Sequence, residues 1–221
     1  MSSIKKNCFP DENRKLYTMN TEFLTDPETY ARYYHEMSAA RREKIDRLCQ
    51  EKDRRLSLAA GILLDRGLQN YGLREADVNI APGAHGKPYL SDYPDIHFSL
   101  SHSHKMAMAV FADAEVGCDI EYQKRLNEKL ARRFFCPQEY AWMMEERDIQ
   151  KRKGRFYRLW TLKESFLKAT GMGLLLPLDS FCFVFEGELL CSLRQQYDDA
   201  EYLLEEYPLA DYSAAICTRL E

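Results

Sequence analysis

The chain has 221 residues, of which 45% are hydrophobic and 30% charged, with a formal net charge of −4 and a pI near 5.8. This length and hydrophobic content are enough to bury a sizeable core, which excludes a disordered protein. The acidic balance argues against nucleic-acid binding, because neutralising phosphates needs a basic surface. The longest apolar run, residues 173–177, is far too short to cross a bilayer, and residues 1–6 lack the apolar stretch of a secretory signal. We therefore expect a cytoplasmic, monomeric protein that binds neither nucleic acid nor membrane.

The seven cysteines are spread along the chain without any C-x-x-C spacing. They are Cys8, Cys49, Cys118, Cys136, Cys182, Cys191 and Cys217. An odd number without paired spacing predicts neither a disulfide framework nor a zinc site. We expect reduced, buried thiols.

The N-terminal part of the chain shows helical patterns. Asp26-Pro27 is typical of a helix start, and from Ser38 to Leu68 apolar residues recur at helical spacing, with Ser38 as the N-cap. We predict two helices here, the second beginning near Asp53. Their polar faces carry the basic residues Arg41, Arg42, Lys44, Arg47, Arg54 and Arg55. A solvated helix face is the simplest interpretation of each of them.

A hairpin pattern follows these helices. Residues 78–80 form a short predicted strand, residues 81–88 a tight loop, and residues 96–100 and 106–111 two strands joined by a turn at 102–105. Gly86 would let the backbone approach a ligand, and Lys87 offers a compact charge suited to a phosphate or a purine edge. The alternative is an ordinary hairpin loop with a solvated lysine. Ser101 and His102 offer a hydroxyl and an imidazole to phosphates, although a lone histidine in a loop is usually solvated.

Residues 116–122, Val-Gly-Cys-Asp-Ile-Glu-Tyr, alternate apolar and polar side chains as a half-buried strand does. Asp119 and Glu121 then share one face with Gly117, which leaves room for a bulky ligand. Two carboxylates at i and i+2 repel each other unless a cation or several donors lie between them. With a third carboxylate such as Glu164 they would suffice for Mg²⁺, which completes its shell with water and phosphate. The alternative is a solvated strand face.

The chain after Glu121 is basic and helical from residue 123 to 135, until Cys136-Pro137 breaks the pattern and a new helix begins at Glu139. A basic surface with soft apolar residues behind it suits the docking of an acidic protein. A solvated amphipathic helix is the alternative. The residues concerned are Lys124, Arg125, Lys129, Arg132 and Arg133, with Met143 and Met144 close behind.

The stretch from Phe156 to Gly171 has the spacing of one helix, and Gly171 lies where a C-terminal glycine is expected. Lys163 projects from the middle of the apolar face, while Glu164 and Lys168 lie together along its border. The alternative to a functional role is a snorkelling Lys163 and an i,i+4 pair between Glu164 and Lys168, worth ~0.2–0.5 kcal/mol. Beyond Gly171, strands are predicted at residues 181–185, 188–193 and 212–217.

Two motifs together resemble the signature of a known family. Gly117-x-Asp119-x-Glu121, followed later by Trp160-x-x-Lys163-Glu164-Ser165-x-x-Lys168, is similar to the paired signature of the Sfp-type 4′-phosphopantetheinyl transferases. These enzymes move the phosphopantetheine arm of coenzyme A onto a serine of a carrier protein. Residues 86–90, 98–103 and 134–139 also agree with that family. The resemblance runs from about residue 38 to residue 170, and its chief departure is Cys118, where an aliphatic residue is commoner.

The resemblance implies a magnesium site and a phosphoryl transfer. Asp119, Glu121 and Glu164 would hold Mg²⁺ on the pyrophosphate of coenzyme A. A serine of an apo acyl or peptidyl carrier protein would attack the β-phosphorus, and adenosine 3′,5′-bisphosphate would leave. Glu164 is the first candidate for the base and Glu139 the second, because Glu164 cannot easily be a strong metal ligand and a free base at once.

The resemblance also implies a coenzyme site. His102 and Lys168 would neutralise the pyrophosphate oxygens. An ungapped match places Arg41, Lys44 and Ser57 near the 3′-phosphate. The remaining implied coenzyme ligands are Gly86, Lys87 and Ser101.

The fold expected is α+β, with residues 1–113 binding the nucleotide and residues 114–221 carrying the metal site and the docking surface for the carrier protein. In the resembling family the two α/β halves are related by a pseudo-twofold axis and the active site lies between them. Two other functions stay open. One is a coenzyme A- or carrier-binding protein without catalysis, and the other is a magnesium-dependent hydrolase of the coenzyme A pyrophosphate.

Overall fold

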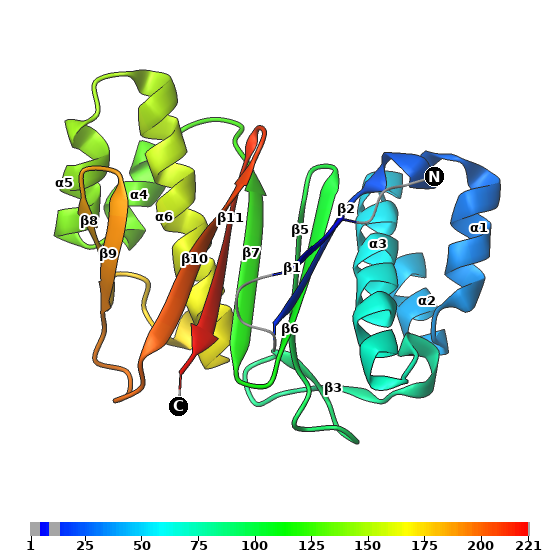
Figure 1. The fold of residues 1–221 in the computed structure, drawn as a ribbon. Coiled ribbons are helices and arrows are strands. Elements are labelled where there is room, and N and C mark those ends of the chain that lie inside the picture. The colour runs from blue at the N-terminus through cyan, green and yellow to red at the C-terminus, as the bar shows by residue number, and fades with distance from the viewer. Residues whose placement is uncertain (1–4, 9–13, 221) are drawn as a thin grey trace.

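The computed structural model describes residues 5–8 and 14–220, which form two halves that lie side by side (Figure 1). Runs of helices and runs of strands follow one another along the chain and every described strand pair is antiparallel, so the expected α+β class is confirmed. The helices are α1 (Pro27–Glu36), α2 (Ala39–Asp46), α3 (Glu51–Leu68), α4 (Glu128–Phe134), α5 (Pro137–Glu145) and α6 (Ile149–Thr170). The strands are β1 (Lys5–Cys8), β2 (Lys15–Asn20), β3 (Ile80–Pro82), β4 (Pro88–Leu90), β5 (His97–Ser103), β6 (Met106–Ala112), β7 (Val116–Tyr122), β8 (Cys182–Glu186), β9 (Leu189–Arg194), β10 (Tyr202–Leu209) and β11 (Tyr212–Arg219).

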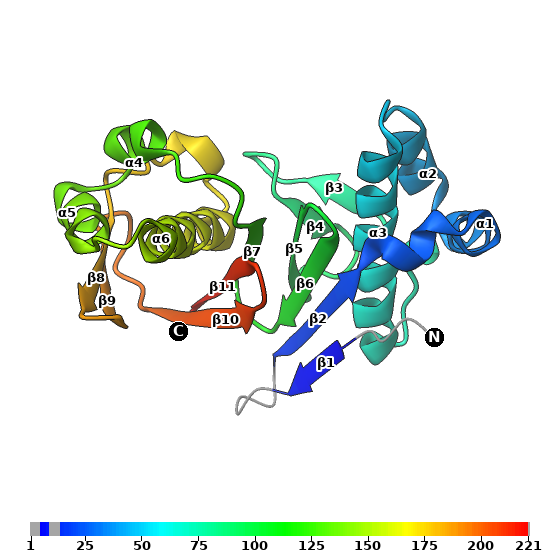
Figure 2. The same ribbon diagram turned by 90° about the horizontal axis from the view of Figure 1, so that it is seen from above.

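The N-terminal half is an antiparallel sheet of order β1-β2-β6-β5 with α3 packed along one face (Figure 2). Helices α1 and α2 lie on the outer side of α3. The predicted Ser38 N-cap is present, since the Ser38 hydroxyl accepts a hydrogen bond from the Arg41 amide at 3.1 Å. Helix α3 buries Leu58, Ile62 and Leu63 against the sheet, because its apolar residues recur at helical spacing.

The C-terminal half sets the longest helix, α6, against the antiparallel sheet β10-β11-β7 (Figure 2). Helices α4 and α5 and the β8-β9 hairpin surround α6 on its other sides. As predicted, α6 ends at Gly171, whose φ of 68° is left-handed. The helix begins seven residues before Phe156, because the Asp148 carboxylate caps the amides of Gln150 and Lys151.

The two halves share a hydrophobic cluster between their sheets. Leu16, Met108 and Val110 contribute from the first half. Strand β7 contributes Val116, Cys118 and Ile120, which are fully buried on the face that the alternation predicts. Strand β6 ends at Ala112 and β7 begins at Val116, so the chain passes from one half to the other in three residues.

Gly117 lies on the opposite face of β7 and is covered by helix α6. A Cβ atom at this position would lie 2.0 Å from the Ser165 carbonyl oxygen and 2.4 Å from the Ala169 amide nitrogen. The expectation that Gly117 leaves room for a ligand is therefore wrong, because the helix backbone occupies that room. The close approach brings the Glu164 and Lys168 side of α6 onto the carboxylate face of β7.

Several element boundaries differ from the sequence prediction. Strand β5 continues to Ser103, so His102 lies in a strand and the turn is formed at His104, whose φ is 56°. The helix predicted from residue 123 begins at Glu128, where Asn127 caps it. Strands β1, β2, β4 and β10 were not predicted. Strand β10 lies at the edge of its sheet and contains Pro208, which edge strands tolerate.

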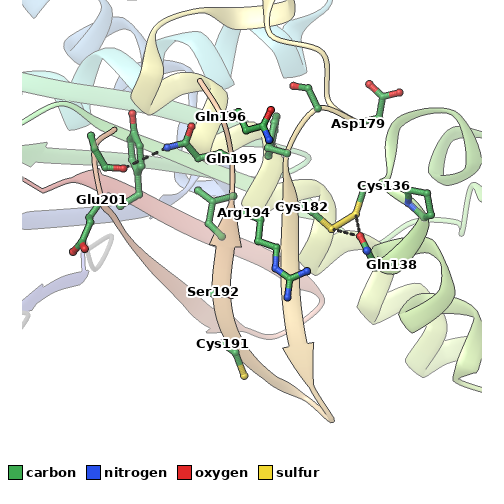
Figure 3. A pocket seen from close by; sticks show the side chains of 16 residues that line it. Cys136, Gln138, Asp179, Cys182, Cys191, Ser192, Arg194, Gln195, Gln196 and Glu201 are labelled. Carbon is green, nitrogen blue, oxygen red and sulfur yellow. Dashed lines mark hydrogen bonds between the residues drawn. A yellow bond between two sulfur atoms is a disulfide. The ribbon is translucent and has the colours of Figure 1, made fainter. Parts of the chain in front are cut away.

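Cys136 and Cys182 form a disulfide, contrary to the expected reduced thiols. Cys136 precedes α5 and Cys182 opens β8, with 5.8 Å between their Cα atoms and a sequence separation of 46. The bond lies on the wall of a cleft of about 1010 Å³ beside the β8-β9 hairpin (Figure 3). No local pattern indicates this pair, because only the tertiary packing brings the two residues together. Cys8 lies outside the residues whose side chains are described.

Removing this cross-link should lower stability. A disulfide that closes a loop of this length stabilises by ~2–4 kcal/mol, chiefly by restricting the unfolded chain. The variant Cys136→Ser with Cys182→Ser, compared with wild type by thermal unfolding under oxidising conditions, should lose several degrees in Tm. The matched control is Cys191→Ser, an exposed free thiol, which should leave Tm unchanged. Equal Tm values for wild type with and without a dithiol reductant would contradict the expectation.

Candidate active site

Three carboxylates from two elements converge where α6 crosses β7. Asp119 and Glu121 project from β7 toward α6, and Glu164 lies on the facing side of that helix. Burial raises the pKa of Glu164 above its usual 4.5, and the negative charges of Asp119 and Glu121 raise it further. Burial likewise raises the pKa of Glu121, with the charge of Asp119 adding to the effect. The three carboxylates, referred to below as the acidic cluster, therefore lie near enough for their charges to act on one another.

Lys168 is held against this cluster. Its ammonium donates to Asp119 Oδ1 at 2.8 Å and to the Cys118 carbonyl at 2.9 Å. Burial alone would lower the pKa of Lys168, but the charge and hydrogen bond of Asp119, together with the nearby Cys118 and Glu164, outweigh it, so the pKa is raised. An ammonium group has three N–H donors, so these two bonds leave one N–H for a ligand. Lys168 is therefore a fixed positive charge beside the carboxylates.

Two serines of β5 also bond to the carboxylates. The Ser101 hydroxyl donates to Asp119 Oδ1 and the Ser103 hydroxyl to Glu121 Oε2, each at 2.7 Å. The sequence predicted Ser101 as a coenzyme ligand, whereas the structure directs its hydroxyl to Asp119. The N-terminal half thus supports carboxylates that belong to the C-terminal half.

The cluster has oxygen atoms to spare for a cation. Asp119 Oδ2 is buried and makes no hydrogen bond to any described residue. No donor in the described part of the chain reaches the Glu164 carboxylate either. A buried carboxylate oxygen without a partner is costly unless water or an ion meets it. Three carboxylates with free oxygens are the ligands that Mg²⁺ prefers, so the residues fit this ion.

His102 lies between this cluster and the basic helices of the first half. His102 is exposed at the surface, yet the protein packed against part of the imidazole lowers the pKa of His102, and the positive charges of Lys168 and Lys44 lower it further. The negative charge of Asp53 acts in the opposite sense and raises the pKa of His102. The structure therefore brings His102, Lys168 and Lys44 into one electrostatic environment, although they come from three different elements.

The other predicted residues of the helical region differ in their accessibility. Arg41 is nearly buried, and its Nε donates to Glu75 at 3.3 Å. Lys44 is exposed on the next turn of α2. Ser57 is buried on α3, and its hydroxyl makes no hydrogen bond within the described residues. Lys44 is thus the more accessible of the two cations, because the Arg41 guanidinium is held in its ion pair with Glu75.

The loop of Gly86 and Lys87 lies at the junction of the halves. Gly86 has a φ of 88°, which favours glycine in this turn. Lys87 forms an ion pair with Glu115 and approaches the Ala169 carbonyl at 3.4 Å. The hydrogen bond from His97, together with Lys87, holds the pKa of Glu115 at about 2. Residues of both halves line a cleft of about 420 Å³ beside this loop.

Glu139 and Lys163 lie apart from the acidic cluster. Both side chains are fully buried and form an ion pair at 2.8 Å. The Glu139 carboxylate also accepts hydrogen bonds from the amides of Cys136 and Phe183, and Lys163 donates to the carbonyls of Leu178 and Phe181. Glu139 therefore joins α5, α6 and β8, and the structure does not bring this second candidate for the base to the site. The alternative interpretation, in which Lys163 extends past the apolar rim to solvent, is therefore wrong, because its side chain is fully buried.

Sequence reasoning missed Ser103 and Glu115. The signal for Ser103 was the serine at every second position of residues 99–103, which puts three hydroxyls on one face of a strand. Glu115 had no such signal, because its partners His97 and Lys87 come from distant parts of the sequence.

The chain is similar to known proteins of one family. A family described as the 4′-phosphopantetheinyl transferase superfamily matches residues 115–217, which include all three carboxylates and Lys168. The chain is 30% identical to the 4′-phosphopantetheinyl transferase Sfp of Bacillus subtilis, over 92% of this chain and 91% of the relative. It is 34% identical to the 4′-phosphopantetheinyl transferase ffp of Bacillus subtilis over the same shares. The chain belongs to the 4′-phosphopantetheinyl transferase family.

Among solved structures, the holo-[acyl-carrier-protein] synthase of Thermotoga maritima aligns with 49% of this chain and 64% of its own, at 20% identity and a TM-score of 0.42. The two Bacillus subtilis relatives each match 92% of this chain. Similarity to the family therefore extends on both sides of residues 38–170, which carry the motifs. Within the described residues no helix has the length and apolar character needed to cross a membrane.

The acidic cluster of this transferase should make its stability depend on pH and on Mg²⁺. Glu121 and Glu164 have a raised pKa in the folded protein, so the folded state binds their protons more tightly than the unfolded state does. Without metal, their contribution to stability therefore falls as the pH rises from about 4.5 through the raised values. A cation that binds the ionised carboxylates should remove this penalty. Mg²⁺ at about 100 times its Kd would add about 2.7 kcal/mol at neutral pH.

The measurement is the increase in Tm on adding Mg²⁺, recorded from pH 5 to pH 8. The increase should be large at pH 8 and should shrink toward pH 5, where protons compete for the carboxylates. An increase that does not change with pH would contradict the proposed coupling between the cluster and the metal.

Proposed function

We propose that the chain transfers the 4′-phosphopantetheine group of coenzyme A to a serine of an apo carrier protein and releases adenosine 3′,5′-bisphosphate. Membership of the transferase family supports the reaction class. The observation that carries the assignment to this chain is the acidic cluster with Lys168 fixed beside it at the boundary between the halves.

Asp119, Glu121 and Glu164 are proposed to hold Mg²⁺. The free Oδ2 of Asp119 and the Glu164 carboxylate, which no described donor reaches, support this assignment. The bound ion would neutralise the pyrophosphate of coenzyme A and so favour departure of the nucleotide. Lys168 would add its remaining N–H to the same phosphates, and His102 would bind them from the other side.

The nucleotide is proposed to lie between residues 1–113 and residues 114–221. The cleft beside Lys87 supports this placement, because residues of both halves line it. Lys44 is the candidate for the 3′-phosphate, since it is exposed and shares the environment of His102. Ser57 could add its unpartnered hydroxyl. Arg41 would act chiefly through its ion pair with Glu75, which fixes the start of α2.

The transfer itself requires positioning and charge stabilisation. The carrier serine forms a bond from its oxygen to the β-phosphorus, and the bond from that phosphorus to the bridging oxygen breaks. The serine proton would pass to Glu164, directly or through a water molecule, provided that the cation does not hold this carboxylate as a strong ligand. The electron pair of the broken bond leaves with adenosine 3′,5′-bisphosphate.

One mass measurement separates this function from its alternatives. An apo carrier protein is incubated with the enzyme, coenzyme A and Mg²⁺, and both the protein and the small molecules are weighed. A phosphopantetheine adduct on the carrier serine supports the transferase. Free phosphopantetheine would mean a hydrolase of the coenzyme A pyrophosphate, and unchanged substrates would mean a binding protein.

The carrier protein is proposed to dock on the basic segment that includes α4. None of its cations forms an ion pair with any residue that the structure describes, so their charge is available to a partner. They are Lys124, Arg125, Lys129, Arg132 and Arg133. Met143 is fully buried and cannot join this surface, which corrects the sequence expectation, whereas Met144 is half-buried.

Charge reversal tests this docking surface. Arg132→Glu with Arg133→Glu should raise the KM for the carrier protein roughly tenfold, equivalent to about 1.4 kcal/mol, and leave the KM for coenzyme A nearly unchanged. Steady-state kinetics with each substrate varied in turn provides the two constants. An equal rise in both KM values would mean that the segment lies at the nucleotide site. If neither KM changes, the segment is an ordinary solvated helix face and the proposed docking surface is wrong.

A further inference from the structure

Strands β5 and β7 lie side by side although each is the edge of a different sheet (Figure 1). Three alternate serines of β5, referred to below as the serine ladder, meet the backbone of β7. The hydroxyls of Ser99, Ser101 and Ser103 accept hydrogen bonds from the amides of Cys118, Ile120 and Tyr122 at 3.0, 3.3 and 3.1 Å. Edge amides that would otherwise lack a partner are thus satisfied by side chains of the other half.

Two members of the serine ladder have a second bond. Each hydroxyl carries one hydrogen, so a serine that accepts from an amide can still donate once. Ser101 donates to Asp119 and Ser103 donates to Glu121. Ser99 bonds to no carboxylate, and the residue beside it on β7 is Cys118, whose thiol donates to the Ser99 carbonyl.

The two carboxylates depend on their serines to different degrees. Asp119 has a second donor in Lys168, which would keep it oriented without Ser101. Glu121 has no second protein donor among the described residues, and its longer side chain has more rotamers to lose. The Ser103 bond engages Oε2 alone and leaves Oε1 for another ligand.

We propose that Ser103 is a positioning residue, which holds Glu121 in the orientation that binds the divalent cation and makes the metal site depend on contact between the two halves. The identity of the cation site rests on the proposed function. The role of Ser103 rests on its two hydrogen bonds. Partners that orient metal ligands typically change metal affinity 10–100-fold when they are removed.

The chain supplies a matched control for this proposal. Ser99→Ala removes an amide acceptor from the serine ladder and touches no carboxylate. Ser103→Ala removes the same kind of acceptor and also frees Glu121. Any difference between the two variants in metal binding therefore reports the carboxylate contact alone. Ser103→Thr keeps the hydroxyl and is the conservative variant expected to rescue binding.

Titration calorimetry measures the binding of Mn²⁺, used as the probe, to the full chain in the presence of coenzyme A. The Tm of each variant is measured separately in the absence of metal. Ser103→Ala should raise the Kd for Mn²⁺ by roughly tenfold or more. Ser99→Ala and Ser103→Thr should stay within about twofold of wild type. Both alanine variants should lose a similar amount of Tm, because each loses one amide acceptor.

Each other outcome overturns the proposal. An unchanged Kd in Ser103→Ala, or an equal rise in Ser99→Ala, would show that the serine ladder only joins the sheets. Absence of Mn²⁺ binding by wild type would remove the site that Ser103 is said to position. Failure of the proposed function is seen separately, as wild type that binds Mn²⁺ but leaves the mass of the carrier protein unchanged.

Discussion

Asp119→Ala should reduce transfer of phosphopantetheine by roughly 10²–10³-fold or more at saturating coenzyme A, because it removes charge stabilisation that operates in a site shielded from water. The variant loses the buried Oδ2 that is free for a cation and also the oxygen that holds Lys168. The fold should survive, since Asp119 faces α6 and lies outside the hydrophobic cluster between the sheets. The measurement is kcat with an apo carrier protein, alongside Tm.

The neighbouring Ile120 is the control for this prediction. Its side chain is fully buried on the opposite face of β7. Ile120→Ala should lower the free energy of unfolding by ~2–5 kcal/mol, as other truncations of buried aliphatic side chains do. Its turnover per folded molecule should stay close to that of wild type. Near-wild-type kcat in Asp119→Ala would remove Asp119 from the metal site.

The sequence could predict the parts of the site that follow from local periodicity. The alternation in residues 116–122 correctly separated Asp119 from Ile120, because a strand has a period of two. The apolar spacing of residues 156–171 placed a helix with its end at Gly171, because a left-handed residue favours glycine there. Both results use the geometry of one element at a time.

The sequence could not predict contacts between residues that are distant along the chain. Lys163 and Glu139 form an ion pair in the core, and no pattern in the residues near either one predicts this partner. Gly117 suggested space for a ligand, although the space is filled by the backbone of α6. The bond between Ser103 and Glu121 joins two sheets whose relative placement is set by a shared hydrophobic cluster, which no short motif encodes.

Glu164→Gln should lower kcat by roughly 10²–10⁴-fold, the range for loss of a general base, while the KM for coenzyme A changes little. Gln has nearly the same size as Glu and keeps one oxygen that can face a cation. It cannot take up the proton of the carrier serine. The raised pKa of Glu164, caused first by burial, brings it closer to the range in which a base works at neutral pH.

Glu139→Gln is the matched control, because the same change at a buried ion pair should act on stability. Removing the charged partner of Lys163 should cost about 3–5 kcal/mol of unfolding free energy, and kcat per folded molecule should be retained. A large loss of kcat with an unchanged Tm in this variant would return Glu139 to the list of candidate bases.

Titration of Glu164→Gln with Mg²⁺ decides between the two roles of this residue. If Glu164 acts as the base, saturating Mg²⁺ should leave kcat low, because the missing proton acceptor is not replaced by metal. If Glu164 acts chiefly as a ligand, the variant should need more Mg²⁺ but recover most of its rate. Recovery would therefore exclude Glu164 as the base. The Glu139 carboxylate is already held by Lys163 and two amides, so the serine proton would then have to leave through solvent.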